Sequence, residues 1–559
     1  MLTRLGPILA IVLLTVPVVF GLAGTLLPAF GYLPALGGTM FELAPFRQLL
    51  AEPAILSSAV MSLVVGLVTA AFSIVSVMLF TAAWGGTRIF MRMQHLISPL
   101  LSVPHAGAAF ALAFLIAPSG MIARLISPEL TGWERPPDLL IVHDPMGLSM
   151  MTGLIVKEIP FLLLVTLAAL PLVKPARTRA LIASMGYGRI SGFVFGLWPS
   201  IYPQIRLPVF AVIAFATSVV DVATILGPTT PAPLAVRLVR WMNDPDLSMR
   251  FLASAGAVLQ LGVTATAIVI WMGLEKFGAF LRERLACAGR RYRSDSALRI
   301  GVLVVMLVSA GAIFIGMAAL ALWSVAGLWQ YPDLLPARFE VRNWKRVLPN
   351  LMDPLATTLS VAVVSTLIAV VIAVLCFARE DETSRSAGRG ALTVLYLPLL
   401  VPQVAFLFGL QLFFILVGIE ATWIALVFVH LVFVLPYAWL SLRDPWRAFD
   451  RRYDQIAAGL GQGAARRFFL VRLPMMTRPL LAVAAIGFSV SIGLYLPTVL
   501  IGAGRLTTIT TEAVALASGG NRRVIGIYAF MQMVLPAAGF AVATIVPALI
   551  FRRYRDMHV

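Results

Sequence analysis

Long runs of apolar residues are the feature that most constrains the fold of this chain. The hydrocarbon core of a bilayer is about 30 Å thick, and a helix needs about 20 apolar residues to cross it. Twelve such runs occur, bounded by Arg, Pro, Gly or acidic residues. They lie near residues 7–30, 54–84, 97–118, 150–173, 208–228, 250–274, 300–326, 354–378, 391–418, 421–442, 479–502 and 524–551. We therefore expect an all-α, polytopic membrane protein, in which the first run is a retained helix and not a cleaved signal.

The net charge of +18 would favour nucleic-acid binding in a soluble protein, because 43 Lys and Arg stand against 25 Asp and Glu. Only 12% of the residues are charged, however, and 60% are hydrophobic. If the N-terminus is cytoplasmic, twelve spans return the C-terminus to the same side, and most Lys and Arg then fall in cytoplasmic segments. Basic residues dispersed in this way follow the positive-inside rule and attract anionic lipid. We expect lipid contact and no nucleic-acid partner, and the two cysteines are too few for a disulfide framework.

Matching motifs divide the chain into two halves. The run Pro99-Leu-Leu-Ser-Val-Pro104 resembles Pro398-Leu-Leu-Val-Pro402, and Pro160-Phe161 resembles Pro436-Tyr437. The offset between the halves falls by about 23 residues from the first motif to the second. This change predicts an insertion in the first half, in the outer loop at 119–149. With six spans in each half, both halves enter the membrane from the same side, so the repeat is parallel.

These features predict two six-helix halves, residues 1–275 and 300–559. Their cores cover about 54–275 and 354–551. Residues 276–299 join the halves and are rich in arginine, which predicts a cytoplasmic linker. Charged linkers between helical bundles are common, so we expect no function of its own for this one.

A long cytoplasmic loop is predicted between the fourth and fifth spans of each half. In each loop a short helix ends at Gly, which can take the left-handed conformation, and a second short helix leads to Pro thirteen residues later. Arg466 and Phe468 give the second helix of the second loop a basic and an apolar side. An exposed apolar stripe of this kind favours docking to lipid or to a partner protein. The landmarks are Ala180, Gly186 and Pro199 in the first loop and Gln455, Gly461 and Pro474 in the second.

This arrangement resembles the EAA loop of binding-protein-dependent ABC importer permeases. The Gly-to-Pro spacing matches in both halves, and the second loop keeps the apolar pair of the motif as Val471 and Leu473. The first loop has Gly196 and Trp198 at the corresponding positions. The usual Glu is replaced by Ala180 in one loop and by Gln455, beside Asp454, in the other, while one alanine of the motif is present as Ala457.

The resemblance covers most of the chain and implies two fused permease halves of a type I ABC importer in a bacterial cytoplasmic membrane. Thr217–Pro228 and Tyr495–Ala513 resemble a fused branch of the group that serves thiamine, ferric iron and polyamines. The family implies two copies of an ATPase subunit, which bind ATP and Mg, and a solute-binding protein outside the cell. The lack of a G-x-x-x-x-G-K-[ST] phosphate loop agrees with a chain that binds no cofactor or metal itself. The residues implied to couple the chain to the ATPase are Ala180, Gly186, Trp198, Pro199, Asp454, Gln455, Ala457, Gly461, Arg466, Phe468, Leu473 and Pro474.

Three charged residues lie in predicted spans, namely Lys157, Glu158 and Asp221. An unpaired charge costs at least about 2.5–3.5 kcal/mol at the centre of a bilayer, so these groups should face protein or water. One interpretation is a structural salt bridge between Lys157 and Asp221. The other places all three on the solute pathway, where a net charge of minus one would favour a cation such as thiamine, a polyamine or a metal ion.

Uncharged polar residues in the spans leave similar alternatives. Pro497, between Tyr495 and Thr498, should break the eleventh span and free backbone carbonyls, either beside the solute or at a packing kink. His105 and His430 are expected to be hydrogen-bonded core residues.

Two other functional classes compete with the importer. In an ion-coupled secondary transporter, Lys157, Glu158 and Asp221 would form a relay, but the two cytoplasmic loops would have no role. An integral membrane enzyme is disfavoured because the sequence has no HExxH motif and no nucleophile elbow. We therefore expect a transport subunit with no catalytic residues.

Overall fold

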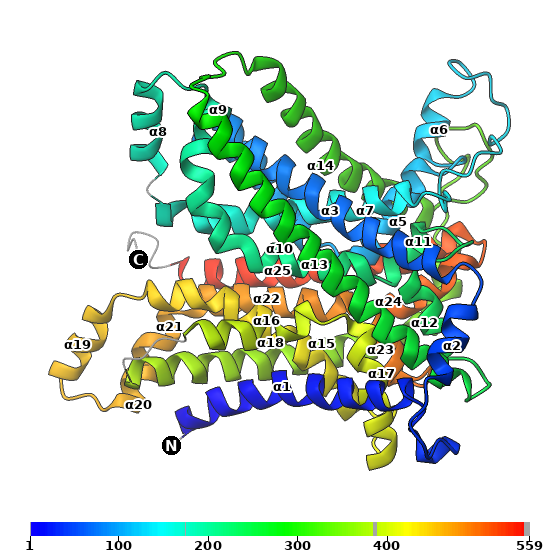
Figure 1. Ribbon diagram of the computed structural model, residues 1–559. Helices are drawn as coiled ribbons and strands as arrows, with labels where there is room; N and C mark the ends of the chain where they lie inside the picture. Colours follow the sequence, from blue (N-terminus) through cyan, green and yellow to red (C-terminus); the bar gives the residue numbers. More distant parts are fainter. Residues whose placement is uncertain (1, 174, 384–387, 553–559) are drawn as a thin grey trace.

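The computed structural model describes residues 2–173, 175–383 and 388–552, and the regular elements in these ranges are all helical. Two isolated β-bridges in loops are the only extended pairings there. The long helices run in roughly one direction, and α1 begins at the same end of the molecule at which α25 ends (Figure 1). The predicted all-α, polytopic fold is confirmed.

Within the described ranges, ten helical segments are long and apolar enough to cross a membrane. Two further pairs of helices pass the same test but are sharply bent, which gives up to twelve spans if each pair is counted once. The ten are α1 (Leu2–Ala29), α3 (Ile55–Trp84), α5 with α6 (His105–Ile116, Met121–Ile126), α7 (Leu148–Ala169), α9 to α10 (Arg189–Ser218), α13 (Met249–Cys287), α14 (Ser296–Ser324), α15 (Arg342–Thr383), α18 (Trp423–Arg447) and α25 (Arg522–Ile550).

The two bent pairs lie in the second half. Helix α16 (Arg389–Leu400) meets α17 (Gln403–Val417) at 86°, and the segment Ala464–Met475 meets α22 (Thr477–Gly493) at 71°. The remaining α-helices are shorter, and some lie at the ends of the bundle while others lie inside it. They are α2 (Ala44–Ala51), α4 (Arg88–Ile97), α8 (Pro175–Ser184), α11 (Asp221–Leu226), α12 (Leu234–Met242), α19 (Arg451–Gly459), α20 (Ala464–Arg467), α21 (Leu473–Met475), α23 (Leu496–Gly502) and α24 (Ile509–Ala515).

Proline sets the first break in each half. Val103 and Val401 are extended (ψ of 122° and 126°), as expected for residues that precede proline. Pro104 and Pro402 then start α5 and α17. The predicted continuous spans at 97–118 and 391–418 are therefore wrong, because each is divided at its Val-Pro step.

The fifth predicted span of each half is also divided. Helix α10 ends at Ser218 and α11 begins at Asp221, while α22 ends at Gly493 and α23 begins at Leu496. The predicted helices at 208–228 and 479–502 are thus not continuous. Hydropathy does not detect the breaks, because the residues in them are as apolar as the helices on either side.

The first helix of each predicted half packs against the other half. Helix α1 lies along α15 and α17, with Gly409 N–H donating to Thr25 Oγ1 at 3.0 Å. A Cβ atom on Gly21 would lie 2.2 Å from the carbonyl oxygen of Phe406. In the same way α14 packs on α5, where a Cβ atom on Gly316 would lie 2.5 Å from the carbonyl oxygen of Ala111. Small residues allow these backbones to approach closely, as is usual between membrane helices.

The segment between the halves is shorter than predicted. Helix α13 continues to Cys287 and α14 begins at Ser296, so only residues 288–295 of the predicted linker at 276–299 are non-helical. The extra turns of α13 contain Ala, Leu and Arg twice each, and these residues are good helix formers.

Candidate functional site

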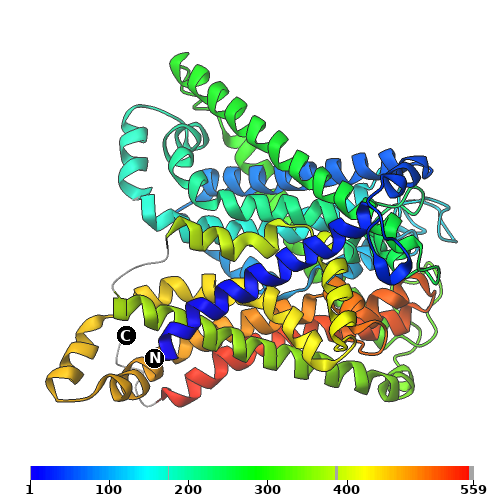
Figure 2. The same cartoon turned by 60° about the horizontal axis from the view of Figure 1, so that its bottom comes forward.

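Two helix–turn–helix loops project from the end of the bundle at which α1 begins (Figures 1 and 2). We call residues 175–197 loop 1 and residues 451–472 loop 2. In loop 1, α8 is followed by a turn, by α9 (Arg189–Gly192) and by the π-helical turn η4 (Phe193–Leu197). In loop 2, α19 is followed by a turn, by α20 and by the π-helical turn η5 (Phe468–Arg472).

The turns of the two loops have the same backbone. Gly186 and Gly461 have φ of +79° and +77°, a conformation that glycine adopts without strain. The Gly186 N–H donates to Ala183 O at 3.0 Å, and the Gly461 N–H donates to Ala458 O at 2.9 Å. Each π-helical turn is followed by the predicted apolar residue and proline, Trp198-Pro199 in α10 and Leu473-Pro474 in α21. Each proline lies in the first turn of a helix, where its missing N–H is tolerated. We expected proline to end the short helix before it, but the helical backbone continues through both prolines.

Each loop is anchored by arginine at the end of a long helix. In loop 1, Arg179 and Arg189 donate to Gly85 O, which follows α3, at 2.9 and 3.0 Å. Burial and the neighbouring Arg189 lower the pKa of the Arg179 guanidinium. In loop 2, Arg472 pairs with Asp381 of α15 at 2.7 Å.

The predicted coupling residues lie mostly on the surface of the loops. Ala180, Gln455, Arg466 and Pro474 are exposed, whereas Ala457 is buried. Asp454 pairs with Arg467 at 3.7 Å, and Phe468 packs on Phe469 with 5.2 Å between the ring centroids. Large apolar side chains that the motif did not identify are more exposed, namely Leu181 and Met185 in loop 1 and Ile456, Leu460, Phe469 and Leu470 in loop 2.

A second group of polar side chains lies inside the bundle, near the break between α10 and α11. Lys157 Nζ donates to the carbonyls of Leu100 and Leu101 at 3.1 and 3.2 Å. Glu158 Oε1 is 2.9 Å from His105 Nε2. The predicted Lys157–Asp221 bridge is therefore wrong, because the lysine is turned toward the η2 carbonyls (Ser98–Ser102).

Asp221 is the first residue of α11 and is only 6% exposed. In the described part of the chain, no other side chain lies within hydrogen-bond or ion-pair distance of its carboxylate. His105 and Tyr495 lie within electrostatic range of this carboxylate. Histidine 105, expected to be an ordinary core residue, is 34% exposed and contacts Phe215.

The corresponding break in the second half is uncharged. Tyr495 precedes α23, and Pro497 lies in its first turn. Thr498 Oγ1 is 3.0 Å from His430 Nε2, and Ser491 Oγ is 2.7 Å from His430 Nδ1. His430 is thus a hydrogen-bonded core residue, as expected.

The helix before the second break contacts the start of α5. Ser489 of α22 donates to Ser102 O at 2.9 Å, and a Cβ atom on Gly493 would lie 3.5 Å from Pro104. Because His105 follows Pro104, this junction holds the His105–Glu158 pair between the halves. The signal that could have identified His105 is its place directly after the proline of a repeated motif, where the second half has Gln403.

The chain is similar to a known transport protein along almost its entire length. It is 28% identical over 506 residues to the inner membrane ABC transporter permease protein YnjC of Escherichia coli (strain K12), covering 90% of this chain and 91% of that protein. No family model matches the chain.

Proposed function

We propose that this chain is the transmembrane permease subunit of an ABC importer in a bacterial inner membrane. The similarity to an inner membrane ABC transporter permease and the ten to twelve apolar helical segments support this function. The observation that carries the proposal is the pair of loops, which share an unusual backbone and lie at corresponding places before the fifth helix of each half.

In this proposal, each loop docks on one of two copies of an ATPase subunit at the cytoplasmic face. The exposed apolar side chains of loops 1 and 2 would enter that partner, and the basic residues around them keep this end of the bundle cytoplasmic, together with both termini. ATP and Mg would bind to the ATPase and not to this chain. Closure of the ATPase dimer would then rock the halves and give alternating access.

The solute would pass between the two helix breaks. In this proposal, one wall would consist of Glu158, Asp221 and Lys157, and the other of Tyr495, Pro497 and Thr498. Two carboxylates close to aromatic rings favour a small cation, since carboxylates and aromatic faces both attract positive charge. Thiamine and polyamines fit this class, and a solute-binding protein outside the cell would deliver them.

Valine in place of Gly461 tests the coupling loops. A β-branched residue at φ of +77° is strained by about 1–3 kcal/mol, so the turn should reshape and copurification of the ATPase with the tagged chain from native membranes should fall. Gly186→Val should act in the same way in loop 1. Gly463→Val is the matched control, because Gly463 has an ordinary φ of −64° and open space around it. If both positive-φ variants retain as much ATPase as the control, the coupling role is wrong.

An ion-coupled secondary transporter is the second candidate, favoured by the partly buried Glu158–His105 pair. Uptake of radiolabelled thiamine and spermidine into vesicles separates the two functions. The importer requires ATP and its ATPase, whereas uptake driven by a proton gradient without ATPase would support the relay.

A further inference from the structure

The segment that joins the two halves lies directly on loop 1. The N–H of Gly188 and the hydroxyl of Ser191 both donate to Arg291 O at 3.1 Å. In the opposite direction, Arg293 Nε donates to Gly186 O at 3.1 Å. Residues 288–295, part of the predicted linker at 276–299 for which no function of its own is expected, therefore form a second layer over this loop.

This segment also supplies a cap that loop 1 lacks. Gly188 is the N-cap of α9 and has no side chain to accept the free N–H groups of the first turn. Asp295 Oδ2 accepts from the N–H of Ile190 at 3.2 Å. A carboxylate about one hundred residues away in the sequence thus takes the place of the missing capping side chain.

Loop 2 has the same backbone, but among the residues that the structure describes no such layer covers it. Its N-cap Gly463 has φ and ψ of −64° and 158°, against −63° and 165° for Gly188. A Cβ atom on Gly188 would lie 2.3 Å from the carbonyl oxygen of Tyr292, whereas one on Gly463 would meet no atom within 4 Å. The close contact at loop 1 therefore comes from the linker and not from the loop conformation.

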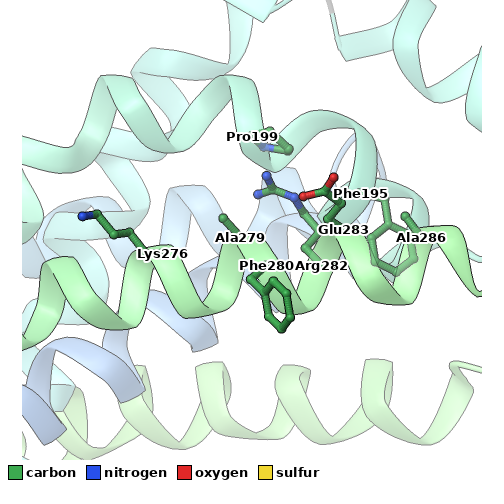
Figure 3. Close-up of a pocket in the computed structure, with 8 residues that line it drawn as sticks. All are labelled: Phe195, Pro199, Lys276, Ala279, Phe280, Arg282, Glu283 and Ala286. Carbon is green, nitrogen blue, oxygen red and sulfur yellow. The ribbon is translucent and has the colours of Figure 1, made fainter.

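The linker also changes the charge at the tip of loop 1. A Cβ atom on Gly186 would lie 2.8 Å from a guanidinium nitrogen of Arg293 and 3.0 Å from one of Arg291, and no atom lies within 4 Å of the same point on Gly461. Beside the loop, a groove of about 550 Å³ separates the end of α13 from the turn at Pro199. Arg282 and Glu283 extend toward this turn (Figure 3). The exposed Met185, which directly precedes Gly186, therefore lies beside the basic groups that the linker contributes.

We propose that residues 288–295 form a strap that docks on loop 1 and is part of the surface on which a partner subunit binds there. The identity of the partner rests on the proposed function. Two identical ATPase copies would then be held by unlike surfaces, one with an added basic rim and one without. The partner surface at loop 1 should carry acidic groups that complement Arg291 and Arg293.

Alanine at Gly188 tests the strap in the full-length chain. Its Cβ must displace the backbone of Tyr292, so trypsin should cut after Arg290, Arg291 or Arg293 about tenfold faster than in the wild type, as expected from the loss of one or two hydrogen bonds. The rate of cleavage is measured from the appearance of two half-length fragments. Gly463→Ala is the matched control, and trypsin should cleave it at the wild-type rate. Equal rates for Gly188→Ala and Gly463→Ala would show that the linker is not docked.

Asp295→Ala tests the strap without a substitution in the sequence of loop 1. It removes the carboxylate that accepts from Ile190 and should accelerate cleavage by a smaller factor, about threefold. A wild-type rate in this variant would overturn the capping role of Asp295.

Protection by the partner tests the second part of the proposal. When the ATPase copurifies, the same cleavage should slow, and Arg291→Glu with Arg293→Glu should weaken copurification more than Arg466→Glu in loop 2. Copurification without protection would overturn the partner role of the strap and leave the proposed function intact. A complete lack of copurifying ATPase would instead contradict the proposed function, while the result for Gly188→Ala would still decide whether the strap is docked.

Discussion

The two helix breaks inside the membrane share a backbone but not a chemistry. In the first half, Val219 is extended (ψ 136°) and Val220 returns to the helical region before Asp221. In the second half, Leu494 (ψ 102°) and Tyr495 do the same before Leu496. The first break carries Asp221 and lies near the Glu158–His105 pair, whereas the second is surrounded by the neutral hydrogen bonds of His430. The same backbone conformation therefore occurs in two different chemical environments.

The two breaks differ in what they contribute to the stability of the fold. Both ring nitrogens of His430 have partners, so the neutral break is a satisfied network that fixes the position of α23. Asp221 is buried without a side-chain partner, which is costly in a medium of low dielectric constant. In the proposed function, this cost is expected for a group on the solute pathway, whereas the second break would support the opposite wall.

Removal of Glu158 should have the largest effect on this comparison. Glu158→Ala leaves His105 without its partner and Lys157 without a neighbouring carboxylate. Because Glu158 is buried but His105 is about one-third exposed, we expect a loss of about 1.5–3 kcal/mol, the range for a hydrogen bond to a charged group. Unfolding of the purified chain in detergent, followed by helical circular dichroism, measures this loss. Glu134→Ala in the exposed outer loop should change stability by less than about 0.5 kcal/mol. Similar stabilities for the two variants would remove the distinction between the breaks.

Thr498→Val probes the neutral break. It leaves the buried His430 Nε2 without its partner, which should cost about 1–3 kcal/mol in the same unfolding measurement. Thr152→Val is a matched control, because both hydroxyls donate to the carbonyl four residues earlier but Thr152 is exposed. An equal cost for both variants would mean that the His430 network adds nothing to stability.

Asp221→Asn should have the opposite sign. Neutralising an unpaired buried carboxylate should raise the unfolding free energy by about 1 kcal/mol, part of the about 2.5–3.5 kcal/mol that such a charge costs. Uptake of thiamine or spermidine should fall on the order of tenfold, since a charge-assisted contact to the solute is lost. The exposed Asp138→Asn should leave both quantities unchanged. A variant that is less stable and transports normally would make Asp221 structural.

The smallest effect concerns the first turns of α7 and α18, the helices that carry Glu158 and His430. Asp144 accepts from the N–H groups of Leu148 and Ser149, whereas the neutral Thr422 accepts from the N–H of Ala425. Although partial burial opposes the shift, the hydrogen bonds from Ser149 and Leu148 lower the pKa of Asp144 below its usual value.

A lowered pKa means that the charged form stabilises the folded chain at neutral pH. This contribution should be lost as pH falls through the folded-state pKa, below the ordinary value of 3.8. Asp144→Ala should therefore cost about 0.5–1 kcal/mol at pH 7 and less at acidic pH, while Thr422→Ala should cost a similar amount at both. Denaturation at pH 7 and at the lowest pH at which the chain stays folded compares them. If Asp144→Ala lowered the unfolding free energy by the same amount at both pH values, the stabilisation would not come from the charge of Asp144.

Features that depend on residues close in sequence could be predicted. Membrane spans follow from hydropathy, and the turns at Gly186 and Gly461 follow from the residue type that a left-handed turn requires. The breaks at Val219 and Leu494 could not be found, since apolar residues are equally common in helices and in breaks. The Lys157–Asp221 bridge failed for a different reason. The lysine had backbone carbonyls available at Leu100 and Leu101, and no pattern of charged residues reveals such partners.

The exchanged positions of α1 and α14 determine the order in which the chain can be completed in the membrane. Helix α1 also packs on α13, but it is synthesised before α15 and α17, and its contacts with these two helices can form only after the whole first half and the strap have been made. Until then its glycine-lined face must remain in contact with lipid or with the insertion machinery. The newly inserted first half is therefore incompletely packed, and the packing of the bundle can be completed only after the second half has been inserted.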